Sequence, residues 1–200
     1  MPNSRSHRLT ALQLAISATT VLLCIEHARG ADLILSGGLN YAAPTEIQSG
    51  SDRHWTGAAA PTAGLTLDLP LSEVPLSLET GVFWKSSKSE RTDPDDSTKT
   101  TKGTWTDIPL LIHYHFDPSI RIGIGGYWSF LGAGDAVSPT ESPDSGVLLN
   151  LRARFRIAEP LSLTLDARYL HGLSNLASNP SDTYNSRSIQ VLAGVLCPIF

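Results

Sequence analysis

Strict alternation of apolar and polar side chains over residues 146–157 is the feature that most restricts how this chain folds. Every odd position of this segment is apolar, and the even positions from Asn150 onward are polar and include Arg152, Arg154 and Arg156. Successive side chains of a β-strand point to opposite faces, so the segment predicts a strand with one hydrocarbon face and one cationic face. The cationic face needs water or acidic partners. Because similar segments recur, we predict a barrel with an apolar outer surface and a charged interior.

Eight candidate strands follow one another along the chain. Each has an apolar row that alternates with a row of small, polar or charged residues, although the last is apolar on both faces towards its end. The predicted strands cover residues 32–41, 55–69, 75–85, 104–116, 119–130, 146–157, 161–170 and 186–200. Pro109 and Pro198 each lack a ladder donor, so we expect both at strand ends or unpaired positions.

The connections between these segments alternate in length. Three are tight turns rich in Pro and Asp, at residues 70–74, 117–118 and 158–160,. Four are long and polar, at residues 42–54, 86–103, 131–145 and 171–185. Short turns at one end and long loops at the other are typical of up-and-down outer-membrane barrels. We therefore predict an all-β, eight-stranded antiparallel up-and-down transmembrane barrel. Its even number of strands puts both termini on the short-turn side.

Aromatic residues sort by strand end in this scheme. Residues expected at the long-loop rim are Tyr41, Trp55, Trp84, Trp105, Trp128, Tyr169 and Tyr184. Residues expected at the opposite rim are Phe116, Phe155 and Phe200. Aromatic girdles of this kind mark the two lipid–water boundaries of membrane barrels, and the apolar row carries no charge along the first seven predicted strands. Both observations favour a location in the outer membrane of a Gram-negative envelope.

The polar row contains six cations and four acids. They are Asp68, Glu79, Lys85, Asp107, Arg121, Arg152, Arg154, Arg156, Asp166 and Arg168. Eight strands enclose a space that side chains just fill, so charges inside must pair or be hydrated. We predict a cross-barrel ion-pair network in which Arg152 and Arg154 bridge Glu79, Asp107 and Asp166 and plug the interior; a water-filled lumen is the alternative. The residues expected to leave space for the arginine side chains are Gly64, Gly81, Gly123 and Gly125.

Residues 1–30 predict a secretory signal peptide. Arg5 and Arg8 precede a mostly apolar run, and Ala28 and Gly30 form a small-x-small cleavage site,. An uncleaved anchor is the alternative, because the run is near the lower length limit for spanning a bilayer. Cleavage leaves one barrel domain at residues 31–200 with Cys197 as its single cysteine, so no disulfide is expected.

Composition and motifs give no indication of an enzyme or a cofactor. The net charge is −4, and nothing predicts nucleic-acid binding,. His171 and Ser174 could form a hydrolase pair, but a spacing of three puts them on opposite faces of a strand. His113 and His115 share a face, yet no third metal ligand is evident nearby. Residues 93–96 are acidic but lack the spacing of a calcium loop.

Several stretches resemble the PorT-like, OmpA-like family of eight-stranded outer-membrane barrel domains. They are Thr-Asp-Ile-Pro-Leu-Leu at 106–111, the glycine-rich 123–127, Ala-Arg-Tyr-Leu-His-Gly-Leu-Ser-Asn at 167–175, and Phe200. The resemblance covers nearly all of residues 31–200 and implies the barrel fold and an outer-membrane location. It also implies that Phe200 is similar to the signal read by the outer-membrane assembly machinery. It implies no activity, because a fold does not fix a function.

The sequence therefore predicts an outer-membrane barrel that is not an enzyme. Its role would be structural, or a surface interaction through the long loops with an extracellular partner or a secretion apparatus, and its surroundings would be membrane lipid. One alternative is a lipid-active barrel similar to a lipid A deacylase. Another is a soluble lipocalin-like binding barrel with the apolar rows inside.

Overall fold

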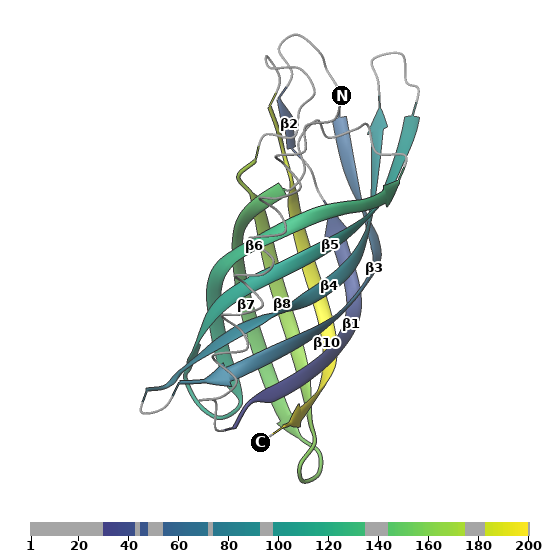
Figure 1. Cartoon of the computed structure of the whole chain (residues 1–200). Helices are drawn as coiled ribbons and strands as arrows, with labels where there is room; N and C mark the ends of the chain where they lie inside the picture. The colour runs from purple at the N-terminus through teal and green to yellow at the C-terminus, as the bar shows by residue number, and fades with distance from the viewer. Residues whose placement is uncertain are drawn as a thin grey trace, which may run out of the picture.

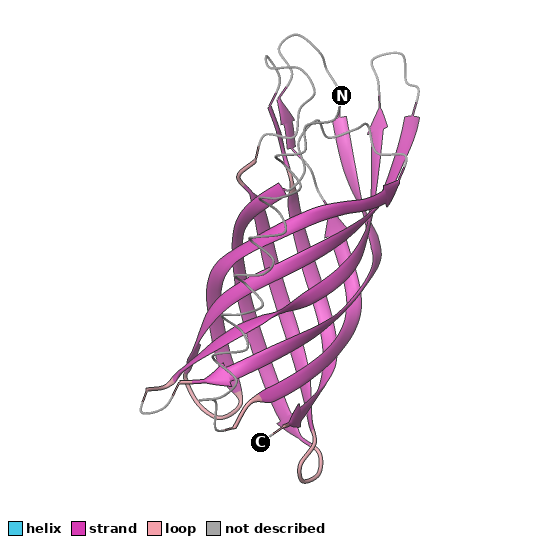
Figure 2. Ribbon diagram, viewed as in Figure 1, coloured by secondary structure: helices cyan, strands magenta, loops and turns pink. Residues whose placement is uncertain are grey.

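The computed structural model describes residues 30–42, 45–47, 54–71, 74–92, 98–134, 144–174 and 183–199. The predicted signal peptide and Phe200 lie outside these residues, and so do the side chains of Trp55 and Tyr184. The described chain is built from β-strands joined by turns, as Figure 2 shows. Within it, no helix is long and apolar enough to cross a membrane.

Eight strands close into one antiparallel barrel (Figure 1). They are β1 (Asp32–Ala42), β3 (His54–Pro70), β4 (Leu76–Thr92), β5 (Thr98–His115), β6 (Ile120–Gly134), β7 (Asp144–Arg156), β8 (Ser162–Gly172) and β10 (Arg187–Pro198). Strands that follow one another in the barrel pair in sequence order, and β1 closes the sheet against β10. The predicted eight-stranded up-and-down barrel is confirmed.

The two ends of the barrel differ as predicted. The turn between β7 and β8 lies at the same end as the C-terminus in Figure 1. Asp32, the first residue of β1, pairs with Pro198, the last residue of β10. The first barrel strand therefore begins, and the last one ends, at this end of the barrel. Pro198 is the last residue of β10, where its missing N–H leaves no gap in the ladder,. Pro109 lies at an interruption of the β4–β5 ladder, between the pairs Thr80–Leu110 and Phe83–Asp107.

All four predicted long loops contain further strand structure. The connection predicted at residues 86–103 is wrong, because β4 and β5 continue as a paired ladder up to the pair Thr92–Thr98. This extension is rich in Ser, Thr and Lys and shows no apolar row, so alternation could not reveal it, although threonine itself favours strands. β2 (Thr45–Ile47) and β9 (Thr183–Asn185) also pair with each other, at the long-loop end of the barrel.

Apolar rows face outward and polar rows face inward. On β8 the residues alternate between buried and exposed along nearly the whole strand. Leu35 on β1 is 64% exposed, whereas its neighbour Ser36 is buried. This arrangement is the reverse of a barrel with apolar rows inside. The prediction fails for Leu69, which is buried next to Asp68 because the alternation is lost as β3 ends.

The interior also holds an apolar layer that the sequence patterns did not predict. Four buried residues, one from each of the neighbouring strands β5 to β8, form a single cluster on the inner face of the wall. They are Leu111, Tyr127, Leu148 and Leu170. Each occupies a lumen-facing position. On these four strands, buried polar residues lie on both sides of the layer: Asp107, Ser129 and Asp144 towards the long loops, and His113, Asn150 and Arg168 towards the short turns.

Close packing across strands gives a first testable expectation, at Gly64. A Cβ added at Gly64 would overlap the buried ring of Phe83, whereas at Gly37 the nearest atom is 3.8 Å away. Overpacking a filled core costs about 1–3 kcal/mol, so Gly64→Ala should lower the free energy of unfolding by this amount in urea titrations of the refolded protein. Gly37→Ala on the neighbouring strand is the control and should change it by no more than about 0.5 kcal/mol. Equal effects of the two variants would contradict the packing described here.

Candidate functional site in the barrel interior

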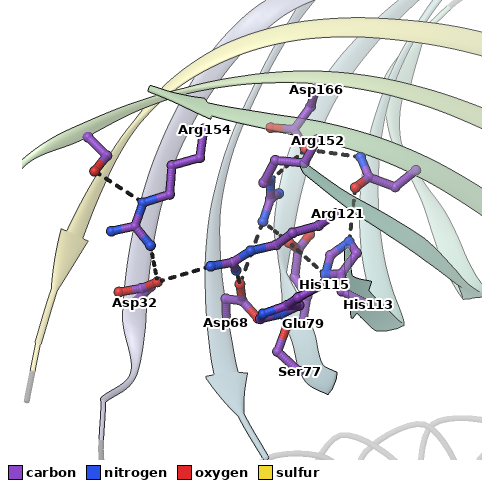
Figure 3. Close-up of polar contacts among 12 residues, drawn as sticks. Asp32, Asp68, Ser77, Glu79, His113, His115, Arg121, Arg152, Arg154 and Asp166 are labelled. Atoms are coloured by element: carbon purple, nitrogen blue, oxygen red, sulfur yellow. Dashed lines mark hydrogen bonds and ion pairs between the residues drawn. The ribbon is translucent and has the colours of Figure 1, made fainter. Parts of the chain in front are cut away.

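Arg152 is the centre of the charged interior. It projects from β7 and is 1% exposed. Its Nη1 lies 2.6 Å from Glu79 Oε2 on β4, and its Nε donates to Asp166 Oδ1 on β8 at 2.8 Å (Figure 3). One guanidinium therefore joins carboxylates from two other strands. Its planar donors suit this bridging role because they present several N–H groups in fixed directions.

Glu79 is held by a second arginine. Arg168 on β8 donates from Nη2 to Glu79 Oε1 at 2.7 Å, so each oxygen of the buried carboxylate lies against a guanidinium. The Arg168 guanidinium also lies over the ring of Phe83, 4.3 Å from its centroid. The sequence pattern did not place Phe83 in the interior, because it lies between Val82 and Trp84 in a run where alternation is ambiguous.

Neutral side chains extend the network. Asn150 donates from Nδ2 to Asp166 Oδ1 at 3.0 Å, and His113 Nε2 lies 2.9 Å from Asn150 Oδ1. His115 instead bonds through Nε2 to Ser77 Oγ at 2.9 Å. The two histidines thus have separate hydrogen-bond partners. Among the residues the structure describes, no cluster of three or more His, Cys, Asp or Glu is arranged to hold a metal ion.

Arg154 has partners other than those predicted. Its Nη1 lies 3.5 Å from Asp32 Oδ2 and its Nε donates to Ser162 Oγ at 3.1 Å. Arg121 forms an ion pair with Asp68 and lies 3.9 Å from the same Asp32 oxygen. Because Arg154 is two residues further along β7 than Arg152, it reaches the inner end of the barrel. The sequence pattern did not include Asp32 among the interior charges, because it is the first residue of its strand.

Lys85 and Asp107 form a separate pair on the outer side of the apolar layer. Lys85 Nζ lies 2.7 Å from Asp107 Oδ2, and Ser129 donates a hydrogen bond to the other carboxylate oxygen. The predicted bridge from Arg152 or Arg154 to Asp107 is therefore not formed. Arg156 also lies outside the network: it is 71% exposed and pairs with Glu159 in the turn after β7.

The glycines in the polar row make room for different groups from those expected. An added Cβ would overlap the ring of Phe83 at Gly64 and the ring of His113 at Gly123. At Gly81 and Gly125 it would overlap backbone atoms of the neighbouring strand. Directly opposite residues are the nearest neighbours across a ladder, so these glycines accommodate cross-strand partners rather than the longer arginine side chains.

The candidate hydrolase residues do not contact each other within the described part of the chain. Ser174 Oγ accepts a hydrogen bond from the Ser145 N–H at 3.1 Å and lies 3.3 Å from Ser145 Oγ. The ring of His171 stacks on Tyr169, with 6.4 Å between their centroids. The contacts between Ser145 and Ser174 join the chain after β8 to the start of β7, whereas the stack lies within β8.

Comparisons with known proteins support the barrel fold. No family model matches the chain, and no curated protein matches its sequence. The crystal structure of the outer-membrane protein OprG from Pseudomonas aeruginosa aligns with a TM-score of 0.58 and 12% identity, covering 86% of this chain and 97% of OprG. Neisserial surface protein A aligns at 0.48 and 13% over 84% and 99% of the two chains. AlkL, solved in lipid bilayers, aligns at 0.48 and 13% over 86% and 92%.

The chain is thus a closed, eight-stranded antiparallel barrel with the fold of outer-membrane barrel structures. At this identity the similarity to OprG shows the fold alone. The alignment does not describe the paired interior, which is known here from the side chains of this chain.

The role of Arg152 can be tested by removing its charge. Arg152→Met would leave Glu79 and Asp166 short of a cation, and breaking a buried pair in this way costs about 3–5 kcal/mol. Arg156→Met on the same strand is the matched control, because an exposed pair contributes about 1 kcal/mol or less. Urea titrations of the two refolded variants measure the difference. A loss at Arg152 no larger than at Arg156 would show that the network does not stabilise the barrel.

Proposed function

We propose that the protein is an outer-membrane β-barrel whose interior is closed by side chains and whose role is structural or interactive. The observation that carries this proposal is the outer wall: between the two rims its exposed rows are apolar and uncharged. A charged outer face would suit a barrel surrounded by water, whereas hydrocarbon tails require an uncharged one.

Strand length and aromatic placement support the same proposal. β1 and β8 have 11 residues each, and a tilted strand needs about 9–11 residues to cross a bilayer. Aromatic side chains exposed on the wall towards the long-loop end are Tyr41, Trp84, Trp128 and Tyr169, and towards the short-turn end Tyr114, Phe116 and Phe155. Their tips can remain at the polar boundary while their rings contact lipid.

The paired charges support a closed lumen. Among the described residues, five cations and six acids lie inside the barrel, and the buried pairs of the inner part lie on the short-turn side of the apolar layer. The pairs of Glu79 with Arg152 and Arg168 span the interior, and eight strands enclose little more space than side chains fill, so a steady aqueous pore would require these side chains to move apart,. We therefore favour the plug over the water-filled lumen.

The finer parts of the proposal rest on the sequence. They are membership of the PorT-like, OmpA-like family, assembly through Phe200, and an extracellular or secretion-apparatus partner reached through the long loops. The Asp107-Ile108-Pro109 motif that carries part of the resemblance lies in β5, where Asp107 binds Lys85. We also propose that the protein performs no enzymatic step, since the described partner of Ser174 is Ser145 and not His171.

Cell fractionation with gel mobility tests the location. We expect the protein expressed from its full chain to fractionate with the outer membrane and to change mobility on boiling, because detergent does not unfold a closed membrane barrel without heat. A soluble periplasmic protein with unchanged mobility would overturn the proposal.

Planar-bilayer recordings test the plug. The purified monomer should show no large, steady conductance, since paired side chains fill the inner part of the barrel. An Arg152→Ala variant refolded in the same way should show more frequent openings, because it removes the residue that joins β4, β7 and β8. A large steady conductance of the unaltered protein would establish the water-filled alternative.

A further inference from the structure

A cavity opens at the short-turn end of the barrel. Its volume is about 520 Å³, which is in the range of clefts that hold small molecules,. Its lining comes from the β5–β6 turn, the end of β7, the β7–β8 turn, the start of β8 and the end of β10. Arg154 and Ser162 in this lining belong to the inward-facing rows of their strands, so the cavity lies at the mouth of the lumen.

Two arginines give the lining its positive charge. Arg154 and Arg156 are two residues apart on β7 and therefore lie on one face of the strand, whereas Phe155 between them points outward,. The Arg154 side chain is 26% exposed and that of Arg156 is 71% exposed, in contrast to 1% for Arg152. Both guanidinium groups are thus reached from the cavity and from solvent rather than enclosed in the network.

The first arginine keeps hydrogen-bonding capacity for a ligand. Arg154 donates from Nε to Ser162 and from Nη1 to Asp32, the latter over 3.5 Å (Figure 3). The same Asp32 oxygen also lies 3.9 Å from Arg121, so this carboxylate is shared between two cations. A guanidinium has five N–H donors, and these contacts leave Nη2 of Arg154 for another acceptor.

Glu159 shows how an anion is held at the second arginine. Its carboxylate forms an ion pair with Nη2 of Arg156 in the turn that follows β7. The Glu159 side chain is 80% exposed, and exposed pairs of this kind are weak, so a ligand can displace it,. Among the described lining residues Glu159 is the one carboxylate, against two cations. Its displacement therefore leaves two positive charges facing the cavity.

Prolines form the apolar part of the lining. Pro118 comes from the β5–β6 turn, Pro160 from the β7–β8 turn and Pro198 from the end of β10. Their rings are rigid and carry no N–H donor. They therefore suit an organic group that is attached to the anion rather than a second charge.

We propose that this cavity binds a phosphate monoester. Its dianion matches the two charges of Arg154 and Arg156, and its oxygens accept the paired N–H groups that a guanidinium presents. The prolines contact the esterified group. The phosphate comes either from a soluble ester or from a lipid headgroup beside the rim. The proposal goes beyond the closed lumen and the membrane location, because it depends only on residues at the short-turn end.

The test is a titration of the refolded, isotope-labelled protein with phenyl phosphate in phosphatidylcholine bilayers, followed by the amide resonances of Ser119 and Ser162. We expect saturable shifts. Benzoate has one charge fewer and should bind at least about tenfold more weakly. Repeating the titration in bilayers that contain phosphatidic acid separates the two sources: a lost response identifies the lipid headgroup as the occupant, and an unchanged one identifies a soluble ester.

Substitutions with opposite effects make the test specific. Arg154→Gln and Arg156→Gln should each weaken binding of phenyl phosphate at least about tenfold. Glu159→Gln removes the competing carboxylate and should tighten binding by up to about fivefold. Arg187→Gln is the matched control, because Arg187 is an exposed arginine at the long-loop end, and it should bind like the unaltered protein.

Three results would overturn the proposal. They are a response in phosphatidylcholine that does not saturate, an affinity that is equal in Arg156→Gln, and an affinity that is unchanged or lower in Glu159→Gln. Benzoate binding as tightly as phenyl phosphate would overturn the assignment to phosphate. Because Arg156 and Glu159 are exposed, their variants keep the test decisive even if Arg154→Gln fails to fold.

Discussion

The bridge from Arg152 to Glu79 and Asp166 is the interaction on which the rest of the interior depends. Charges removed from water are tolerated only when partners replace the lost hydration, and this guanidinium supplies them to carboxylates on two other strands. The same requirement fixes the register of β7. A slip of one residue would turn Arg152 towards the outer wall and bring Leu151 inside, so the ion pairs and the apolar wall specify one arrangement together.

The interior is layered on the side formed by β5 to β8. The arginine network fills the inner part, the cluster around Leu148 and Tyr127 crosses the middle, and the Lys85–Asp107 pair and Asp144 lie beyond it. On this side of the interior the apolar residues lie between the two sets of charges, so substitutions in one set should have little effect on the other. This separation explains why Asp107, although it lies on the polar face of its strand, does not join Arg152.

Alternation was sufficient to predict the strands, their faces and the closed barrel, because each strand separates two different environments. It could not predict the extension of β4 and β5, where both faces are polar and no such contrast exists. Nor could it assign partners. Whether Arg154 meets Asp166 or Asp32 depends on the stagger between strands far apart in the sequence, which no local pattern contains. Phe83 was missed for a related reason, since an aromatic residue in an apolar run fits either face.

The contact between Glu79 on β4 and Arg168 on β8 joins residues 89 positions apart. These two strands are not neighbours in the sheet, so the contact exists only after the sheet has curled upon itself. In a sheet that has curled only in part, the Glu79 carboxylate and the Arg168 guanidinium would have lost part of their hydration without forming their contact. Pairing of the inner charges and curling of the sheet therefore depend on each other.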